Sequence, residues 1–157
     1  MGRALGWVLA FVIGLAAVGG GILLLQSRDD AGVEKEAGPG ERVEARCPGK
    51  PATITHDKRA LSADQLAHAL ALGNVVLRYR GKQPPTALNQ LQDELTGPYD
   101  AEIAAAGQAV ILAPGAETGF EALAWGRRFQ SNSAQDPQLR AFSEAWLGED
   151  SPEPCQS

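Results

Sequence analysis

The sequence of 157 residues has few of the side chains that most often build a reactive site. It contains two histidines, two cysteines and one methionine. No Gly-x-Ser-x-Gly or Ser-x-x-Lys motif marks a catalytic serine, and no Cys-x-x-Cys motif marks a redox centre or a thiol metal site. Hydrolase and transferase chemistry therefore have no supporting motif, and the sequence predicts a protein that is not an enzyme and carries no cofactor.

The sequence also lacks an excess of positive charge. It has 14 lysines and arginines against 19 aspartates and glutamates, a formal net charge of −5. Nucleic-acid binding normally requires a basic face, because the phosphate backbone dominates the affinity. This balance argues against nucleic acid as a partner.

One long apolar segment stands at the N-terminus. Residues 4–25 contain only apolar residues and glycine. A helix of that length spans about 33 Å, which matches a hydrocarbon core of about 30 Å. The alternative is a cleaved signal peptide, whose apolar core is shorter and is followed by a small-x-small site. The run ends in Leu25-Gln26 without such a site, which favours an uncleaved transmembrane anchor.

The charges that flank the anchor predict its orientation. Arg3 precedes the apolar run, whereas Arg28-Asp29-Asp30 follow it. The positive-inside rule then places residues 1–3 in the cytoplasm and the rest of the chain outside. The expected location is the cytoplasmic membrane, which the chain crosses once. The lipid bilayer contacts residues 4–25, and a protein at the membrane surface is the expected partner.

The part after the anchor divides into a linker and a domain. Residues 26–46 mix charges with Gly38-Pro39-Gly40 and are expected to form a flexible linker. Residues 47–157 are expected to form one domain, bracketed by Cys47 and Cys155. An even pair of cysteines in an oxidising compartment predicts a disulfide. Closing so long a loop contributes about 4 to 5 kcal/mol in the chain-entropy model. The alternative is a thiol metal ligand or a redox centre.

Periodicity and capping signals predict an α+β domain. Ser62 and Gln65 are expected to form a capping box at one helix start. Asp136 is expected to be the N-cap of another helix, with Pro137 at its first position. Short apolar runs bounded by glycine or proline predict strands. The expected elements are a helix from residue 63 to Gly73, a strand at 75–80, a helix at 86–95, a helical turn at 100–106, strands at 109–113 and 121–130, and a helix from 137 to Gly148.

This order predicts a small mixed sheet of three or four strands with helices on one face. The strands at 75–80 and 109–113 are joined by a helical crossover and should be parallel. The strand at 109–113 should be central and buried on both faces, and the one at 121–130 should be antiparallel to it. Gly126 is expected to form a bulge in the strand at 121–130.

His68 and His56 are the candidate metal ligands. A lone helical histidine is more often a surface or boundary residue, and the spacing of the histidines and cysteines matches no zinc or copper pattern. Both interpretations stay open for His68. The tandem Arg127-Arg128 is the second candidate site, for an anion or a protein partner. Its structural alternatives are stacking on an aromatic ring, pairing with a carboxylate, or displacement to the surface at Gly126.

Several blocks of the chain resemble a bacterial family common in actinobacteria, the domain of unknown function 3105 family. The blocks are His-Ala-Leu-Ala-Leu-Gly-Asn-Val-Val-Leu-Arg-Tyr at 68–79, Val-Ile-Leu-Ala-Pro at 110–114, Ala-Leu-Ala-Trp-Gly-Arg-Arg at 122–128, and the last helix through Glu-Ala-Trp at 144–146. The likeness covers about residues 50–148. Family members have a similar N-terminal anchoring helix.

The chain departs from the family at its histidine motif. Leu72 stands where the family has a second histidine, and Ala71 stands where it has a glutamate. The upstream Ser-Gly-Pro-His stretch is missing, with only His56 nearby. The family's histidines and glutamate resemble a metal or active site, so the resemblance implies that this chain keeps His68 alone of that site.

Two functions follow from the sequence. The first is a membrane-anchored, extracytoplasmic interaction or assembly module without enzymatic activity. The alternative is binding or trafficking of copper or zinc through His68 and His56.

The predicted topology is tested with a reporter fused after Ser157. A phosphatase that folds only outside the cytoplasm should be active at this position, because the short basic flank stays inside. A reporter that works only in the cytoplasm should be inactive there. The reverse pattern would show that the orientation is wrong.

Overall fold

The computed structural model describes residues 38–50, 52–54, 56–151 and 155. The expected anchor at 4–25 and most of the expected linker lie outside this part of the chain. No helix among the described residues is long and apolar enough to cross a membrane. The chain divides into two units after Gly38, and the fold below is that of the second unit.

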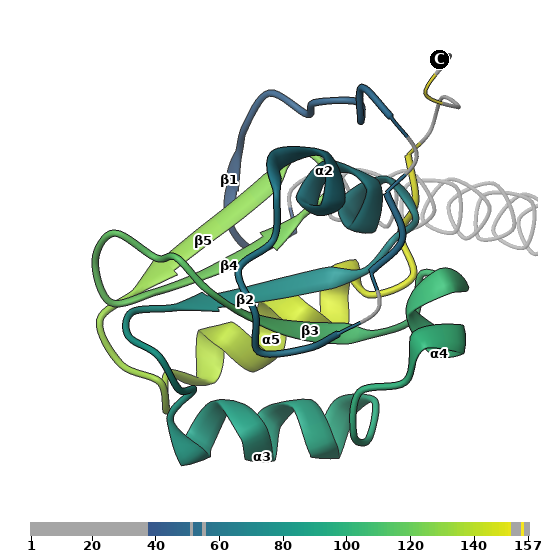
Figure 1. Ribbon diagram of the computed structural model, residues 1–157. Helices are drawn as coiled ribbons and strands as arrows, with labels where there is room; N and C mark the ends of the chain where they lie inside the picture. Colours follow the sequence, from purple (N-terminus) through teal and green to yellow (C-terminus); the bar gives the residue numbers. More distant parts are fainter. Residues whose placement is uncertain (1–37, 51, 55, 152–154, 156–157) are drawn as a thin grey trace, which may run out of the picture. The chain divides into compact units, whose positions relative to one another are not determined.

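The second unit is an α+β fold, as predicted, but its sheet has five strands rather than three or four (Figure 1). Four helices lie in the described part of the chain. The elements in order are β1 (Glu41–Arg42), α2 (Ala63–Ala71), β2 (Val75–Tyr79), α3 (Thr86–Leu95), α4 (Ala101–Ala105), β3 (Val110–Pro114), β4 (Phe120–Ala124), β5 (Arg127–Ser131) and α5 (Pro137–Trp146).

The strand order is β1-β5-β4-β2-β3. The predicted parallel pairing of β2 with β3 is confirmed. The expected position of β3 at the centre is wrong, because β4 pairs antiparallel with β2 and leaves β3 at the edge. The loop after Pro114 crosses the end of β2, where Gly115 and Ala116 donate their amides to the Tyr79 carbonyl. In the described sheet β3 is thus buried on both faces although β2 is its only neighbouring strand.

The predicted single strand at 121–130 is a hairpin. β4 and β5 pair antiparallel from Phe120↔Ser131 to Ala124↔Arg127, so that Trp125 and Gly126 form the connecting turn. Gly126 has a φ of +64°, which glycine adopts without the steric cost of a Cβ atom. Gly126 is therefore a turn residue and not a bulge. After the turn, Phe129 packs on the α5 side of the sheet, whereas Leu123 packs on the opposite side.

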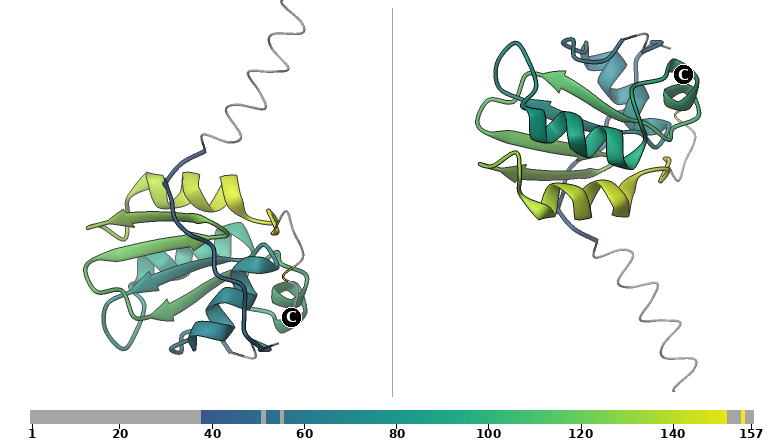
Figure 2. Two further views of the ribbon diagram at one scale, coloured as in Figure 1. Left: turned by 90° about the horizontal axis from the view of Figure 1, so that it is seen from above. Right: turned by 90° about the horizontal axis from the view of Figure 1, so that it is seen from below.

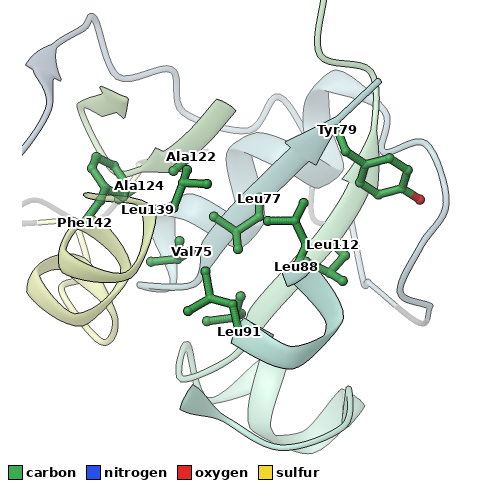
Figure 3. Packing of buried hydrophobic residues seen from close by; sticks show 11 residues of the cluster. Val75, Leu77, Tyr79, Leu88, Leu91, Leu112, Ala122, Ala124, Leu139 and Phe142 are labelled. Carbon is green, nitrogen blue, oxygen red and sulfur yellow. The ribbon is translucent and has the colours of Figure 1, made fainter. Parts of the chain in front are cut away.

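Helices cover both faces of the sheet and not one (Figure 1). β2 and β3 are buried on both sides, so each face needs apolar cover. On one face, α3 contributes Leu88 and α5 contributes Phe142 to a cluster shown in Figure 3. On the other face, α2 and α4 cover a second cluster, with members Ile54, Ala69, Val76, Ala104, Ala109, Ile111, Ala113 and Leu123.

The predicted helix starts are confirmed by their capping bonds. The Gln65 amide donates to the Ser62 hydroxyl at 3.2 Å, and the Ser62 amide donates to the Gln65 side chain at 3.0 Å. Asp136 accepts from the Gln138 amide at 2.9 Å and from the Ser131 hydroxyl at 2.6 Å. These bonds lower the pKa of the Asp136 carboxyl, because they favour its charged form. Local signals of this kind act over a few residues, which is why they predict well.

The last part of the predicted linker is built into the sheet. β1 pairs antiparallel with β5, and the Val43 amide donates to the Gly126 carbonyl at 3.0 Å. The Trp146 indole donates to the Pro39 carbonyl at 2.8 Å. We call residues 39–49 the strap, which runs from α5 to α2 across the strands in Figure 2, left. The strap has too few apolar residues to form a core of its own. It is held because the open edge of β5 offers backbone hydrogen-bond partners, which the composition of the strap does not reveal.

The predicted disulfide between Cys47 and Cys155 is present. It joins the strap to the C-terminal tail, across a sequence separation of 108 residues. The tail returns toward α2, because the Ser151 amide donates to the Ala71 carbonyl at 3.1 Å. The disulfide therefore joins both ends of the described domain beside α2.

The outer edge of β3 is closed by Asp57. Its carboxylate accepts from the Leu112 amide at 2.7 Å and from the Gln92 side chain at 3.0 Å. The next amide, of Lys58, donates to the Leu112 carbonyl at 2.7 Å. The Asp57 side chain is only 9 % exposed. Burial, and then the charge of Asp57, raise the pKa of Tyr79, whose hydroxyl has no hydrogen-bond partner among the described residues.

Replacing Asp57 with alanine should lower the free energy of unfolding by about 2 to 3 kcal/mol, because the substitution leaves the Leu112 amide without its acceptor and removes one of the two acceptors of the Gln92 amide group. Urea unfolding of the full chain in detergent, followed by tryptophan fluorescence, measures this loss. Asp93→Ala is the control, since Asp93 is an exposed residue of α3. It should change stability by less than about 0.5 kcal/mol. Equal losses in the two variants would show that Asp57 does not hold this edge.

Candidate functional site

A groove lies on the α2 side of the sheet, between the strap, α2 and the β4–β5 hairpin. Its volume is about 340 Å³. α2 packs against β2 on this side, and the hollow lies between α2 and residues of β4 and β5. Its lining consists of Val43, Glu44, Ala45, Arg46, Ala63, Leu66, Ala67, Leu70, Arg78, Glu121, Leu123, Ala124, Trp125, Gly126, Arg127 and Arg128.

The apolar part of the groove comes from α2 and the hairpin. Leu66 and Leu70 lie one helical turn apart on α2 and are only partly buried. Leu123 of β4 faces the same cluster, and Trp125 at the turn is also partly buried. Large apolar side chains that remain partly exposed around one hollow are typical of binding surfaces.

A row of alternating charges crosses four strands at this groove. Arg78 of β2 contacts Glu121 of β4 at 2.8 Å, and Glu121 lies 3.9 Å from Arg128 of β5. Arg128 in turn contacts Glu41 of β1 at 2.5 Å. Arg78 also donates to the Gly115 carbonyl. The register sets this row, because Arg78 lies opposite Glu121 and Glu41 lies opposite Arg128.

Exposure differs along the row. The Glu121 side chain is 11 % exposed, whereas Arg78 and Arg128 are 31 % and 39 % exposed. A nearly buried carboxylate requires paired donors, and its two arginines supply them. The guanidinium groups are thus held in place by Glu121 while part of each surface still faces the groove.

The structure separates the two tandem arginines of the sequence. The Arg127 guanidinium lies 4.5 Å from the centroid of the Trp146 ring, a cation–π contact. Arg128 pairs with carboxylates instead. Two of the structural explanations considered from the sequence therefore apply, one to each residue. Both residues border the groove, but only Arg128 presents its guanidinium there, because that of Arg127 lies on Trp146 at the α5 side of the sheet.

The rim of the groove carries two further charges from the strap. Glu44 and Arg46 are exposed, and neither has an ion-pair partner among the residues that the structure describes. The guanidinium groups of Arg46, Arg78 and Arg128 lie at the groove, and they meet the carboxylates of Glu44, Glu121 and the adjoining Glu41. The charges at the groove therefore balance, but its partly exposed guanidinium groups offer hydrogen-bond donors on a chain that is acidic as a whole.

The two histidines lie away from this groove. His56 is exposed, and His68 is partly buried beside a separate cavity of about 180 Å³ with Thr53, Ile54 and Leu72. Cys47 and Cys155 are bonded to each other, so neither offers a thiolate. Among the described residues, no group of three or more histidines, cysteines, aspartates and glutamates is close enough to hold a metal ion.

Sequence reasoning missed Glu41, Arg46, Arg78 and Glu121. Two of them carried a readable signal, because Arg78 and Glu121 are single charges inside otherwise apolar strands. Such a charge has to reach a partner or the surface. The two strap residues gave no signal, since their segment is typical of a linker in composition.

Comparison with known proteins adds one match. The family model described as "Protein of unknown function (DUF3105)" matches residues 47–157. No curated protein and no solved structure matches the chain. The matched region contains α2, the hairpin and both cysteines, whereas residues 43–46 of the groove lie just before it.

His68→Ala tests whether this position is a metal ligand or a boundary residue. We expect a change in the free energy of unfolding of less than about 1 kcal/mol, as for a partly exposed residue without a buried partner. We also expect no stoichiometric metal in the purified full chain, measured by mass spectrometry of the elements. Stoichiometric copper or zinc that disappears in His68→Ala would instead establish a metal-binding protein.

Proposed function

The chain belongs to the DUF3105 family of proteins of unknown function, and we propose that it is an interaction module that binds an acidic, partly apolar segment of another protein. The binding surface is the groove between the strap, α2 and the hairpin. The proposal includes a membrane anchor at residues 4–25 that holds the domain on the outer side of the cytoplasmic membrane.

One observation carries the proposal: an apolar hollow edged by arginines on an acidic domain. Leu66, Leu70 and Leu123 offer a surface for apolar side chains. The guanidinium groups of Arg78 and Arg128 are already oriented by Glu121, so a ligand carboxylate meets donors that need little reordering. Guanidinium groups favour carboxylates because their paired N–H groups match the two oxygens.

The strap provides a reason to favour a peptide over a small anion. The backbone groups of residues 44–46 form no backbone hydrogen bond within the described chain. An extended peptide beside the strap would satisfy them, as strands do when they add to an open edge. The hollow of about 340 Å³ has room for a few side chains of such a peptide.

The groove is poorly suited to catalysis. Its described lining contains no serine, threonine, cysteine or histidine. Its most buried carboxylate, Glu121, is held by two arginines, and paired carboxylates are poor general bases. Metal binding or trafficking through His68 and His56 remains the alternative function, and it would use a different part of the molecule.

A charge reversal at Arg46 tests the proposal. The probe is a short fluorescent peptide of alternating glutamate and leucine, and its binding to the full chain in detergent is followed by anisotropy. Arg46→Glu should raise Kd at least about tenfold, because it places a carboxylate at the rim beside the ligand's own charges. The same peptide should bind the unmodified protein more weakly as the salt concentration rises.

Arg80→Glu is the matched control. Arg80 is exposed but does not line the groove, and its replacement by glutamate changes the net charge by the same amount as Arg46→Glu. Its Kd should stay within about threefold of that of the unmodified protein, since Arg80 is not part of the groove lining. The proposal fails if both variants lose the same affinity, or if a lysine–leucine peptide binds as well as the glutamate–leucine peptide. It also fails if a fatty carboxylate binds and no peptide does.

A further inference from the structure

The strap is fixed firmly at its N-terminal half. The Trp146 indole holds the Pro39 carbonyl at 2.8 Å, and β1 pairs with β5 through Glu41 and Arg42. The Val43 amide donates to the Gly126 carbonyl at 3.0 Å. These contacts place the start of the groove wall by ordinary sheet and side-chain hydrogen bonds.

The second half of the strap has far fewer attachments. Residues 44–46 are exposed and have no backbone hydrogen bonds within the described chain. The next residue, Cys47, is bonded to Cys155. Beyond it, the Gly49 amide donates to the Asp64 carboxylate at 3.1 Å, on the exposed surface. The wall formed by residues 44–46 thus depends mainly on the disulfide for its position.

We propose that the Cys47–Cys155 disulfide is a redox control on the groove: when it is intact the strap forms an ordered wall, and when it is reduced residues 44–46 leave that position. The consequence for ligand affinity rests on the proposed function. The effect on the wall itself does not, because it follows from the attachments of the strap alone.

The chemistry is a thiol–disulfide exchange with a dithiol as reductant. Cys47 is exposed, so a thiolate of the dithiol can attack its sulfur. The bond between Cys47 and Cys155 breaks, Cys155 leaves as a thiolate and takes up a proton, and a mixed disulfide forms at Cys47. The second thiol of the dithiol then attacks the mixed disulfide and releases Cys47. Two electrons and two protons pass to the protein, and the dithiol becomes a cyclic disulfide.

The two sides of the broken bond behave differently. On the Cys155 side, Ser151 stays beside α2, because its amide still donates to the Ala71 carbonyl. Among the described residues, the strap then keeps the exposed bond of Gly49 at this end and no other hydrogen bond. Three residues of the wall then regain backbone freedom, which must be lost again when a ligand binds. Reduction should therefore weaken binding and leave the core of the domain intact.

Hydrogen exchange of the full chain in detergent tests the control of the wall. With dithiothreitol added, the Gly49 amide, which donates to Asp64 at the disulfide end of the strap, should exchange at least about tenfold faster, because this end opens more often. The amides of Val110 to Leu112 should keep their protection, since they belong to the buried strand β3. Unchanged exchange in the strap would overturn the proposal, and so would equal loss of protection in the strap and in β3.

Peptide binding in the same two states tests the consequence. Kd for the glutamate–leucine peptide should rise at least about tenfold on reduction, the cost of reordering a short segment. The Cys47→Ser/Cys155→Ser variant should bind like the reduced protein, with or without dithiothreitol. Unchanged affinity on reduction would overturn the redox control. If the peptide binds in neither state, the proposed function is rejected. Faster hydrogen exchange that is limited to the strap would then still support control of the wall by the disulfide.

Discussion

The arrangement of β2, β4 and β5, and of the groove beside them, depends on the nearly buried carboxylate of Glu121. A charge in that position is costly unless donors surround it, and Arg78 and Arg128 are the donors. They belong to the strands on either side of β4, so the ion pairs fix the register of β2, β4 and β5 together. A slip of one residue in any one of these strands would turn its charge to the opposite face and break the row.

The same constraint shapes the groove. Because Glu121 holds the two guanidinium groups against the sheet, they stay near the hollow instead of extending into solvent. Glu41 of the strap then balances the outer arginine. The groove consequently combines ordered donors with an apolar floor, a combination that suits recognition of acidic, partly apolar ligands.

Both edges of the sheet are closed by segments without regular structure or with very little of it. β1 has two residues and covers part of β5, and Asp57 with Lys58 covers β3. Open edges invite pairing with other chains, so such cover has a clear physical value. On the β5 side, the covering segment is also a wall of the groove. Protection of the edge and construction of the site therefore use the same residues.

The sequence by itself determined the features that depend on neighbours in the chain or on simple counting. Ser62 with Gln65 and Asp136 with Pro137 mark helix starts through bonds to residues two or three positions away. A helical crossover makes β2 and β3 parallel, and two cysteines allow only one internal disulfide. Tertiary structure decided the rest. The insertion of β4 beside β2, the turn at Gly126 and the pairing of β1 with β5 result from competition among distant backbone partners. The groove forms only when these strands have paired, because its arginines, leucines and strap residues come from segments that are far apart in the sequence.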